Sequence, residues 1–388
     1  MKHLLTFIVL LLTSQHLFSQ ALYRAYPSDV LDTERNIKVL KPRNYSENSE
    51  KTYPLIVVLD GDHLFEPVAG NVDYLSYWDQ MPESFVLGIN QSRSRYDETA
   101  INRESGFPEP QSAKFMDFIM ELVQTMRDEY RIAPFTVIIG KDITANLATF
   151  YLMRKKIPFD AYINIDPEYS TLITENLVTK ISQMESNQYY YVATPEKASL
   201  TDDMFTASVD SLLENRKNIH LNYEKIKGVD KYGLGAHAIP RGLNYIFEEY
   251  KLIDEDALVN TAVAANMAAD GKEIKDAATA LETLLEKYKF IKEVYGIDMQ
   301  VRLIDIVTVA EHLIDNKKYD ELIDVAGLAA RAYPEKLYGA FIEGIGYEGI
   351  GRPSRALRAY NAAYALEPAA GITTDDVLDK VEMLQDKK

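Results

Sequence analysis

One stretch decides the fold expected for the first part of the chain: Thr136-Val-Ile-Ile-Gly140-Lys141-Asp142-Ile143-Thr144-Ala145-Asn-Leu-Ala-Thr-Phe150. Its β-branched run predicts a short strand that ends at Gly140, and a helical pattern begins directly afterwards. A turn this tight between a strand and a helix exposes one side chain above a sheet. Here that side chain is Asp142, so the chemistry of one carboxylate bears on every functional interpretation of the chain.

Short apolar runs alternate with helical periodicity up to about residue 250. Buried strands are predicted at residues 55–59, 85–89, 136–139, 161–165 and 189–193, and amphipathic helices at 113–130, 143–155 and 202–216. Strands that alternate with helices predict a mostly parallel sheet covered on both faces. We therefore expect an α/β domain over residues 20–250.

The strand pattern disappears after about residue 252. Residues 257–290 are rich in Ala, Glu, Lys and Leu and contain no Pro, which predicts helices. Small and aromatic residues then fall at the spacing of a 34-residue tetratricopeptide unit: Gly344, Tyr347, Gly351, Ala356, Tyr360, Ala363 and Pro368. We expect an all-α domain with tetratricopeptide-like repeats over residues 251–388, with an ordinary antiparallel helical bundle as the alternative.

The start of the chain has the pattern of a secretory signal peptide. One Lys precedes an almost wholly apolar run at residues 4–12, and Leu17-Phe18-Ser19 offers a cleavage site. The run is too short to cross a membrane, and no comparable run follows. We expect residues 1–19 to be removed, no membrane span, and a secreted or periplasmic protein.

Composition excludes several classes of function. The chain has no Cys, which rules out disulfides, thiolate metal sites, a Cys nucleophile and a lipid-bearing N-terminal Cys. Its net charge of −17 disfavours binding to nucleic acid or to anionic lipid through a diffuse positive field. We therefore expect no nucleic-acid partner.

Several motifs follow one another in a set order between about Arg24 and Tyr250. They are Tyr53-Pro-Leu-Ile-Val-Val-Leu-Asp60-Gly61, Val86-Leu-Gly-Ile-Asn90 with Arg93, Arg95, Asp97 and Thr99 after it, Phe159-Asp-Ala-Tyr-Ile-Asn-Ile-Asp166-Pro167, and His237-Ala-Ile-Pro240. In this order they resemble the secreted esterases that are related to esterase D and enterochelin esterase and carry a tetratricopeptide tail. The resemblance implies an α/β-hydrolase fold with a catalytic triad of nucleophile, His and acid.

The chain departs from this family at the nucleophile. Where the family has Gly-His-Ser-x-Gly-Gly, this sequence has Gly140-Lys-Asp142-Ile-Thr144-Ala145, and the family's Ser at the next strand end is Asp166. A carboxylate is a weak nucleophile toward an acyl carbon and would form an anhydride. It would also place a negative charge beside the developing oxyanion. Ester hydrolysis by the usual route is therefore not expected.

An Asp at this turn has a working precedent in haloalkane dehalogenases and epoxide hydrolases. There the carboxylate attacks a saturated carbon, and a His directs water at the resulting ester. Those enzymes keep a bulky aromatic after the Asp and a small residue two positions on, which Ile143 and Thr144 do not reproduce.

The remaining triad positions follow from the resemblance. His237 is expected in a loop ahead of the last helix of the α/β domain, as the general base or as a structural partner of Asp142. Three carboxylates, Glu196, Asp202 and Asp203, follow the strand at 189–193, and the choice of the triad acid stays open among them.

A ligand cleft is expected around the same turn. It would be lined by Asp60, Gly61, His63, Ile143 and Asp166. The segment Asp60-Gly-Asp62-His63 could suggest metal ligands, but Asp-Gly is also a common turn signal, and no metal is expected. No other cofactor is expected.

Three hypotheses follow. The first is a secreted pseudo-esterase that binds a small molecule in its cleft and a protein on its helical tail. The second is an active hydrolase that uses Asp142 with His237. The third is a structural or assembly protein whose cleft is closed by packing.

Overall fold

The computed structural model describes residues 21–45, 50–184, 187–197, 219–254, 258 and 279–386. The expected signal peptide, the helix predicted at 202–216, and both Asp202 and Asp203 lie outside these residues. The chain divides into two compact units. The first comprises Met1–Glu248 with Tyr295–Ile297, and the second comprises Glu249–Val294 with Asp298–Lys388.

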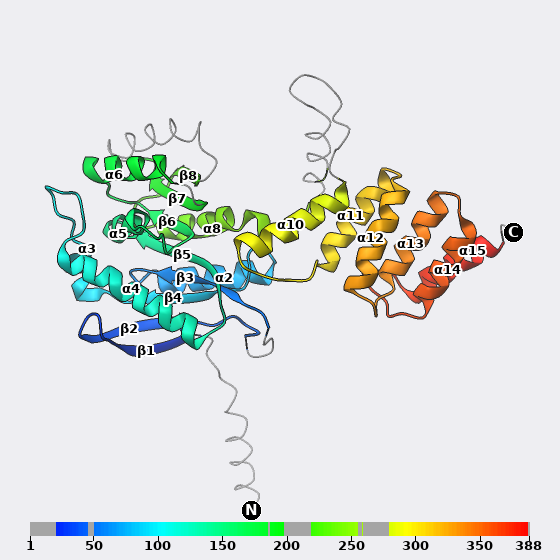
Figure 1. The fold of residues 1–388 in the computed structure, drawn as a ribbon, viewed down its shortest axis with the longest axis horizontal. Coiled ribbons are helices and arrows are strands. Elements are labelled where there is room, and N and C mark those ends of the chain that lie inside the picture. The colour runs from blue at the N-terminus through cyan, green and yellow to red at the C-terminus, as the bar shows by residue number, and fades with distance from the viewer. Residues whose placement is uncertain are drawn as a thin grey trace, which may run out of the picture. The chain divides into compact units, whose positions relative to one another are not determined.

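The first unit is built on one sheet whose eight strands, within the described residues, lie in the order β1-β2-β4-β3-β5-β6-β7-β8 (Figure 1). The two pairs formed by β2, with β1 and with β4, are antiparallel, and all other neighbours are parallel. In chain order the strands are β1 (Ala21–Ser28), β2 (Thr33–Leu40), β3 (Tyr53–Val58), β4 (Phe85–Ile89), β5 (Ile132–Lys141), β6 (Ala161–Ile165), β7 (Gln188–Pro195) and β8 (Ile219–Ile226). The mostly parallel sheet is confirmed, with the five predicted strands as β3 to β7.

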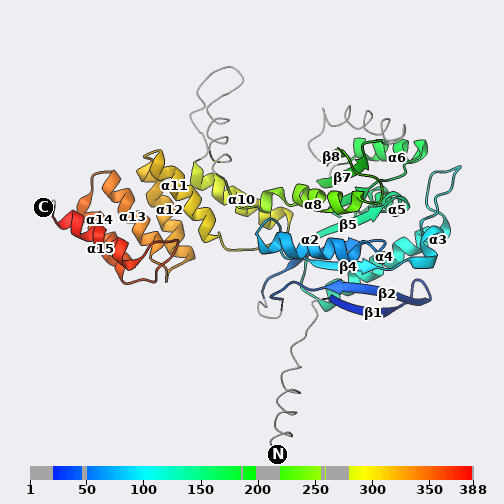
Figure 2. The same cartoon turned by 180° about the vertical axis from the view of Figure 1, so that it is seen from behind.

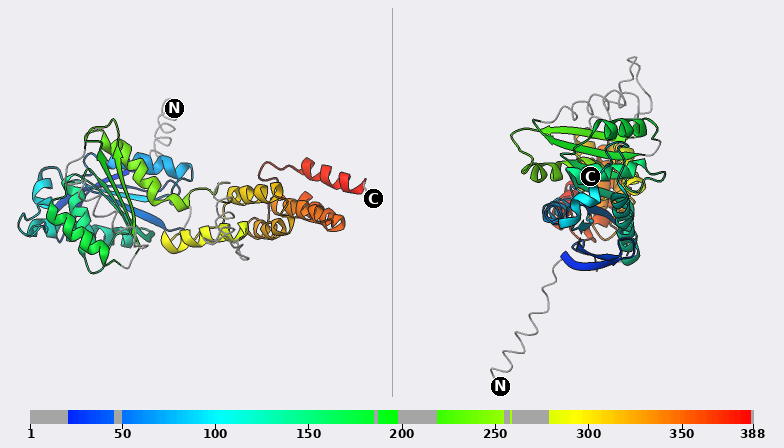
Figure 3. Two further views of the ribbon diagram at one scale, coloured as in Figure 1. Left: turned by 90° about the horizontal axis from the view of Figure 1, so that it is seen from above. Right: turned by 90° about the vertical axis from the view of Figure 1, so that its left-hand side faces the viewer.

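Helices cover both faces of this sheet, as Figure 3 shows edge-on. Neighbouring residues of a strand point to opposite faces, so Tyr190 belongs to the core under α4 (Pro110–Glu129), α5 (Ile143–Thr149) and α6 (Thr171–Ser182). Tyr191 points the other way and contacts α8 (Leu234–Ile246) at Gly242. On that face α8 packs beside α2 (Phe65–Tyr77), as seen in Figure 2.

Short helical segments complete the first unit. The helix predicted at 143–155 is shorter than expected, because α5 ends at Thr149 and a turn of 3-10 helix follows. The short segments are η2 (Ser92–Ser94), α3 (Arg95–Thr99) and η3 (Phe150–Met153), and a further one, η4 (Glu248–Tyr250), spans the boundary to the second unit.

Helices are the only extended secondary structure in the described residues of the second unit, which confirms the all-α prediction for this part of the chain. Its helices are α10 (Ala280–Val294), α11 (Leu303–Asp315), α12 (Tyr319–Ala332), α13 (Tyr338–Gly349), α14 (Pro353–Tyr364) and α15 (Thr374–Gln385). From α10 to α15 each helix packs against the next. The tetratricopeptide repeat itself stays a prediction. Among the helices of the described residues, none combines the length and apolar character needed to cross a membrane.

Close packing of α13 on α14 depends on Gly344, which has no side chain. A Cβ built on Gly344 would lie 2.3 Å from the Cε1 atom of Tyr360, which is fully buried. A Cβ on Gly327, in α12, would meet only the end of the Arg331 side chain, at 3.4 Å. An added methyl group would therefore clash at Gly344 and fit at Gly327.

We expect Gly344→Ala to lower the free energy of unfolding by about 1–3 kcal/mol, because the methyl group overpacks the helix pair. Gly327→Ala, the matched control, should raise it by up to about 1 kcal/mol, because Ala is the better helix former. Urea unfolding followed by far-ultraviolet circular dichroism measures both. Equal effects of the two substitutions would contradict this packing.

Candidate functional site

Strand β5 turns into α5 at Asp142 with almost no connecting residues. Asp142 has φ 54° and ψ −122°, a backbone conformation that costs a non-glycine residue about 1–3 kcal/mol. The turn closes so tightly that a Cβ on Gly140 would lie 2.7 Å from the backbone of Thr144 and Ala145. The strand–turn–helix expected from the sequence is thus present, with the carboxylate at its apex.

Two neighbouring strands end in the same way. Asp60 follows the end of β3 with φ 55°, and Asp166 follows β6 with φ 51°. Asp accepts the left-handed conformation more readily than most residues. Because β3, β5 and β6 are adjacent and parallel, the three carboxylates lie at the carboxyl edge of the sheet. In open α/β sheets this is the edge at which ligands bind.

The carboxylate of Asp60 is fully engaged by the protein. It is buried, with 1% of the residue exposed. Arg95 donates to both of its oxygens, from Nε at 2.6 Å and from Nη2 at 2.9 Å, and the Thr144 hydroxyl donates at 2.8 Å. This network joins β3, the segment after β4 and the turn after β5.

The carboxylate of Asp142 lies between two cations. Its oxygens are 3.1 and 3.0 Å from the Lys141 ammonium, and one of them is 3.8 Å from the Arg95 guanidinium. Burial lowers the pKa of Arg95, but the hydrogen bonds and charge of Asp60, together with the charge of Asp142, outweigh this and hold the pKa above its usual value. The side chain of Asp142 is 27% exposed. Its charge is therefore neutralised locally while one side faces solvent.

The loop after β3 is fixed to the loop after β4. Asp62 accepts hydrogen bonds from the N–H groups of Gln91 and Ser92 and from the Ser92 hydroxyl, at 2.8, 2.9 and 2.7 Å. Burial raises the pKa of Asp62, but these hydrogen bonds outweigh it and leave the pKa below its usual value. Gly61 is packed so closely on β4 that a Cβ would lie 2.7 Å from the Ile89 nitrogen, whereas His63 is exposed.

The expected general base is not where the sequence suggested. His237 lies in the first turn of α8 rather than in a loop, because the helix already begins at Leu234. Just before the helix, Asp230 accepts hydrogen bonds from the N–H groups of Tyr232 and Gly233. Leu234 and Ala238 face the core, which leaves His237 on the exposed side. Within the described residues, His237 makes no hydrogen bond or ion pair.

Among the described residues, no candidate triad acid is bonded to His237 either. Glu196 follows β7 directly and is exposed, without a recorded hydrogen bond or ion pair among the described residues. Asp202 and Asp203 lie outside the described residues. Among the described residues, neither His237 nor Glu196 is hydrogen-bonded to Asp142. The described residues also contain no cluster of His and acidic side chains that could hold a metal ion.

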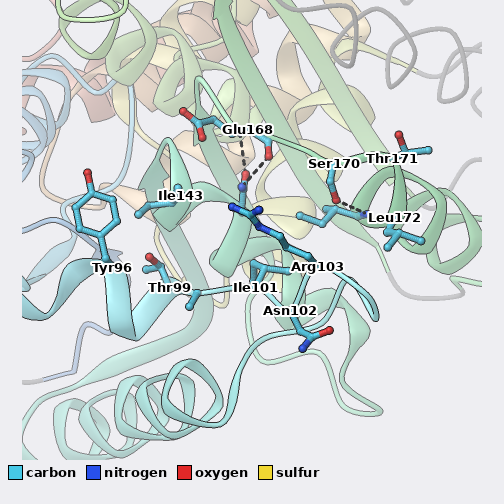
Figure 4. A pocket seen from close by; sticks show the side chains of 13 residues that line it. Tyr96, Thr99, Ile101, Asn102, Arg103, Ile143, Glu168, Ser170, Thr171 and Leu172 are labelled. Atoms are coloured by element: carbon cyan, nitrogen blue, oxygen red, sulfur yellow. Dashed lines mark hydrogen bonds between the residues drawn. The ribbon is translucent and has the colours of Figure 1, made fainter.

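A pocket of about 700 Å³ lies beside the turn (Figure 4). Three segments build it: α3 with the residues after it, the start of α5, and the loop that leads into α6. Its lining residues are Tyr96, Thr99, Ala100, Ile101, Asn102, Arg103, Ile143, Asn146, Glu168, Ser170, Thr171, Leu172 and Ile173. Of the expected ligand-lining residues, Ile143 lines this pocket, whereas Asp60, Gly61, His63 and Asp166 do not.

Two side chains that the sequence did not single out fix one wall of the pocket. Asn146 donates to the carbonyl of Glu168 and accepts from its N–H, both at 2.9 Å. The Tyr169 hydroxyl is hydrogen-bonded to Tyr190 at 2.5 Å and to Thr149 at 3.0 Å. The loop after β6 is therefore tied to α5 and β7.

Comparisons with known proteins agree with this fold. Residues 28–154, less than half of the chain but including the turn at Asp142, match the family described as "Putative esterase". A crystal structure of an uncharacterised protein from Capnocytophaga ochracea aligns with a TM-score of 0.78 and 22% identity, over 95% of this chain and 100% of that one. An IroE-like serine hydrolase from Shewanella oneidensis aligns with a TM-score of 0.59 and 16% identity, over 80% and 99%.

A comparison with curated protein sequences gives no significant match. At these identities the structural likeness shows the fold alone. The first unit thus has an α/β-hydrolase-like fold, and the segment that carries its turn is similar to esterases.

Removing the charge of Asp60 tests the network at the strand ends. We expect Asp60→Asn to lower the free energy of unfolding by about 3 kcal/mol, because it leaves the partly buried Arg95 without its main counter-charge. Asp73→Asn is the control, since Asp73 pairs with Arg43 at a more exposed position, where about 1 kcal/mol or less is expected. Urea unfolding of both variants measures the difference, and equal losses would contradict the role of Asp60.

Proposed function

We propose that this chain is a secreted pseudo-esterase: a hydrolase-fold protein that no longer cleaves esters and acts by binding a small molecule beside its former nucleophile position. The main support is the turn after β5, where the Asp142 carboxylate lies between the side chains of Lys141 and Arg95. In the sequence, Asp142 stands where the resembling family has its nucleophilic Ser.

Ion pairing makes this carboxylate a poor catalyst for acyl transfer. The electron density that would attack a carbonyl carbon is already shared with two cations, and attack would give an anhydride. The oxyanion of the tetrahedral intermediate would form beside a fixed negative charge. Losing a single oxyanion donor costs about 2.7–4 kcal/mol in known enzymes, so an added negative charge is expected to be at least as harmful.

The base position supports the same proposal. A general base acts within about 2.6–3.2 Å of its partner or through one water. His237 is exposed on α8, and no hydrogen bond joins it to Asp142. The alternative of an active hydrolase requires these two side chains to meet directly or through one water.

The pocket favours ligand binding over a purely structural role. Its volume of about 700 Å³ falls within the range of about 300–1,000 Å³ that is usual for small-molecule sites. Ile143 stands at its wall rather than filling it. The pocket is lined by Ile143 but not by Asp142 or His237, so it supports binding beside the turn rather than over the carboxylate.

The rest of the chain completes the proposal from its sequence. The pattern of residues 1–19 supports export to the periplasm or outside the cell. The stacked helices of the second unit support a binding role toward a protein partner, because helical arrays of this kind offer extended surfaces.

Turnover of short acyl esters by the purified mature protein tests the proposed loss of chemistry. We expect the natural protein, Asp142→Ala and His237→Ala all to match the background rate, because none has a connected nucleophile and base. A gain of turnover in Asp142→Ser alone would support loss of activity at this one position. Turnover by the natural protein that disappears in both Asp142→Ala and His237→Ala would instead establish the active-hydrolase alternative.

A further inference from the structure

The pocket beside the turn contains two charged side chains without a counter-ion. Arg103 follows α3 and Glu168 follows β6, and within the described residues neither side chain forms an ion pair or a hydrogen bond. Figure 4 shows the Glu168 carboxylate turned away from the Arg103 guanidinium. Both residues line the pocket, and they come from different segments of the chain.

Most other polar side chains of the pocket are already engaged. Asn146 is bonded to the backbone of Glu168 through both ends of its amide, and the Ser170 hydroxyl accepts from the N–H of Ile173. Asn102 donates to Glu109 at 2.9 Å and accepts from backbone N–H groups of its own loop. These contacts leave Arg103 and Glu168 as the charged groups available to a ligand.

Both charged groups extend from anchored backbone. The two hydrogen bonds of Asn146 fix the main chain of Glu168. The loop that carries Arg103 is closed by Asn102 and by backbone pairing of Ile101 with Pro108. A fixed backbone reduces the conformational entropy that is lost when a ligand binds.

Apolar side chains form much of the remaining wall. They include Tyr96, Ile101, Ile143 and Leu172. A ligand with a single charge would pair with only one of these two exposed protein charges. A ligand with two opposite charges and an apolar body would match all three features.

Resting on the proposed binding function, we propose that the pocket binds an apolar zwitterion of the size of a dipeptide. Its carboxylate meets the guanidinium of Arg103, whose planar fork suits two-point contact with a carboxylate. Its ammonium group meets the carboxylate of Glu168. Its apolar side chains lie against Ile143 and Leu172.

Four forms of one dipeptide test this assignment by isothermal titration calorimetry: free leucylphenylalanine, its N-acetyl form, its C-terminal amide, and the form with both caps. We expect the natural protein to bind the free dipeptide about fivefold more tightly than either singly capped form, since an exposed ion pair contributes up to about 1 kcal/mol. Arg103→Gln should remove only the advantage over the amide, and Glu168→Gln only the advantage over the N-acetyl form.

Arg93→Gln and Glu104→Gln are matched controls, because both residues are exposed near the pocket without lining it. They should leave all four affinities unchanged. Absence of binding by every form, equal affinities for all forms, or dependence on only one of the two charges would overturn the zwitterion assignment. Ester turnover that requires Asp142 would overturn the pseudo-esterase proposal and leave these affinities as they are, so the two failures are distinguishable.

Discussion

The buried carboxylate of Asp60 joins three strand ends that are far apart in the sequence. It receives the guanidinium of Arg95 from the segment after β4 and the hydroxyl of Thr144 from the start of α5. A buried charge is tolerated only when paired and hydrogen-bonded, so this arrangement fixes where Arg95 lies. Arg95 in turn faces Asp142, and the electrostatics of the turn thus follow from a residue on another strand.

The changes at the turn act as a set. The Thr144 hydroxyl accepts from the Lys141 N–H, and its hydrogen lies within reach of two acceptors, the Asp60 carboxylate and the Lys141 carbonyl, both at 2.8 Å. Lys141 then pairs with Asp142 through its ammonium group. The α/β-hydrolase-like fold is present while the charged groups at the turn after β5 bind one another, which fits the rule that function depends on the site rather than on the fold.

Sequence patterns predicted the centre of the fold better than its edges or its site. Continuous apolar runs gave β4 and β6 at their observed bounds. The outer strands β1 and β2 mix charged and apolar residues, and this hides them. The residues around His237, expected as a loop, form the start of α8, which already begins at Leu234. The pocket residues carry no local signal, since only the order of the strands brings their loops together.

Uptake of oxygen-18 by Asp142 is the measurement that tests the central claim most directly. The protein would be incubated in oxygen-18 water with short acyl esters or with alkyl halides, and the peptide that contains Asp142 analysed by mass spectrometry. A carboxylate that acts as a nucleophile acquires oxygen from water when its covalent intermediate is hydrolysed. A structural, ion-paired Asp142 predicts no more label with substrate than without it, and substrate-dependent label at Asp142 would contradict the account.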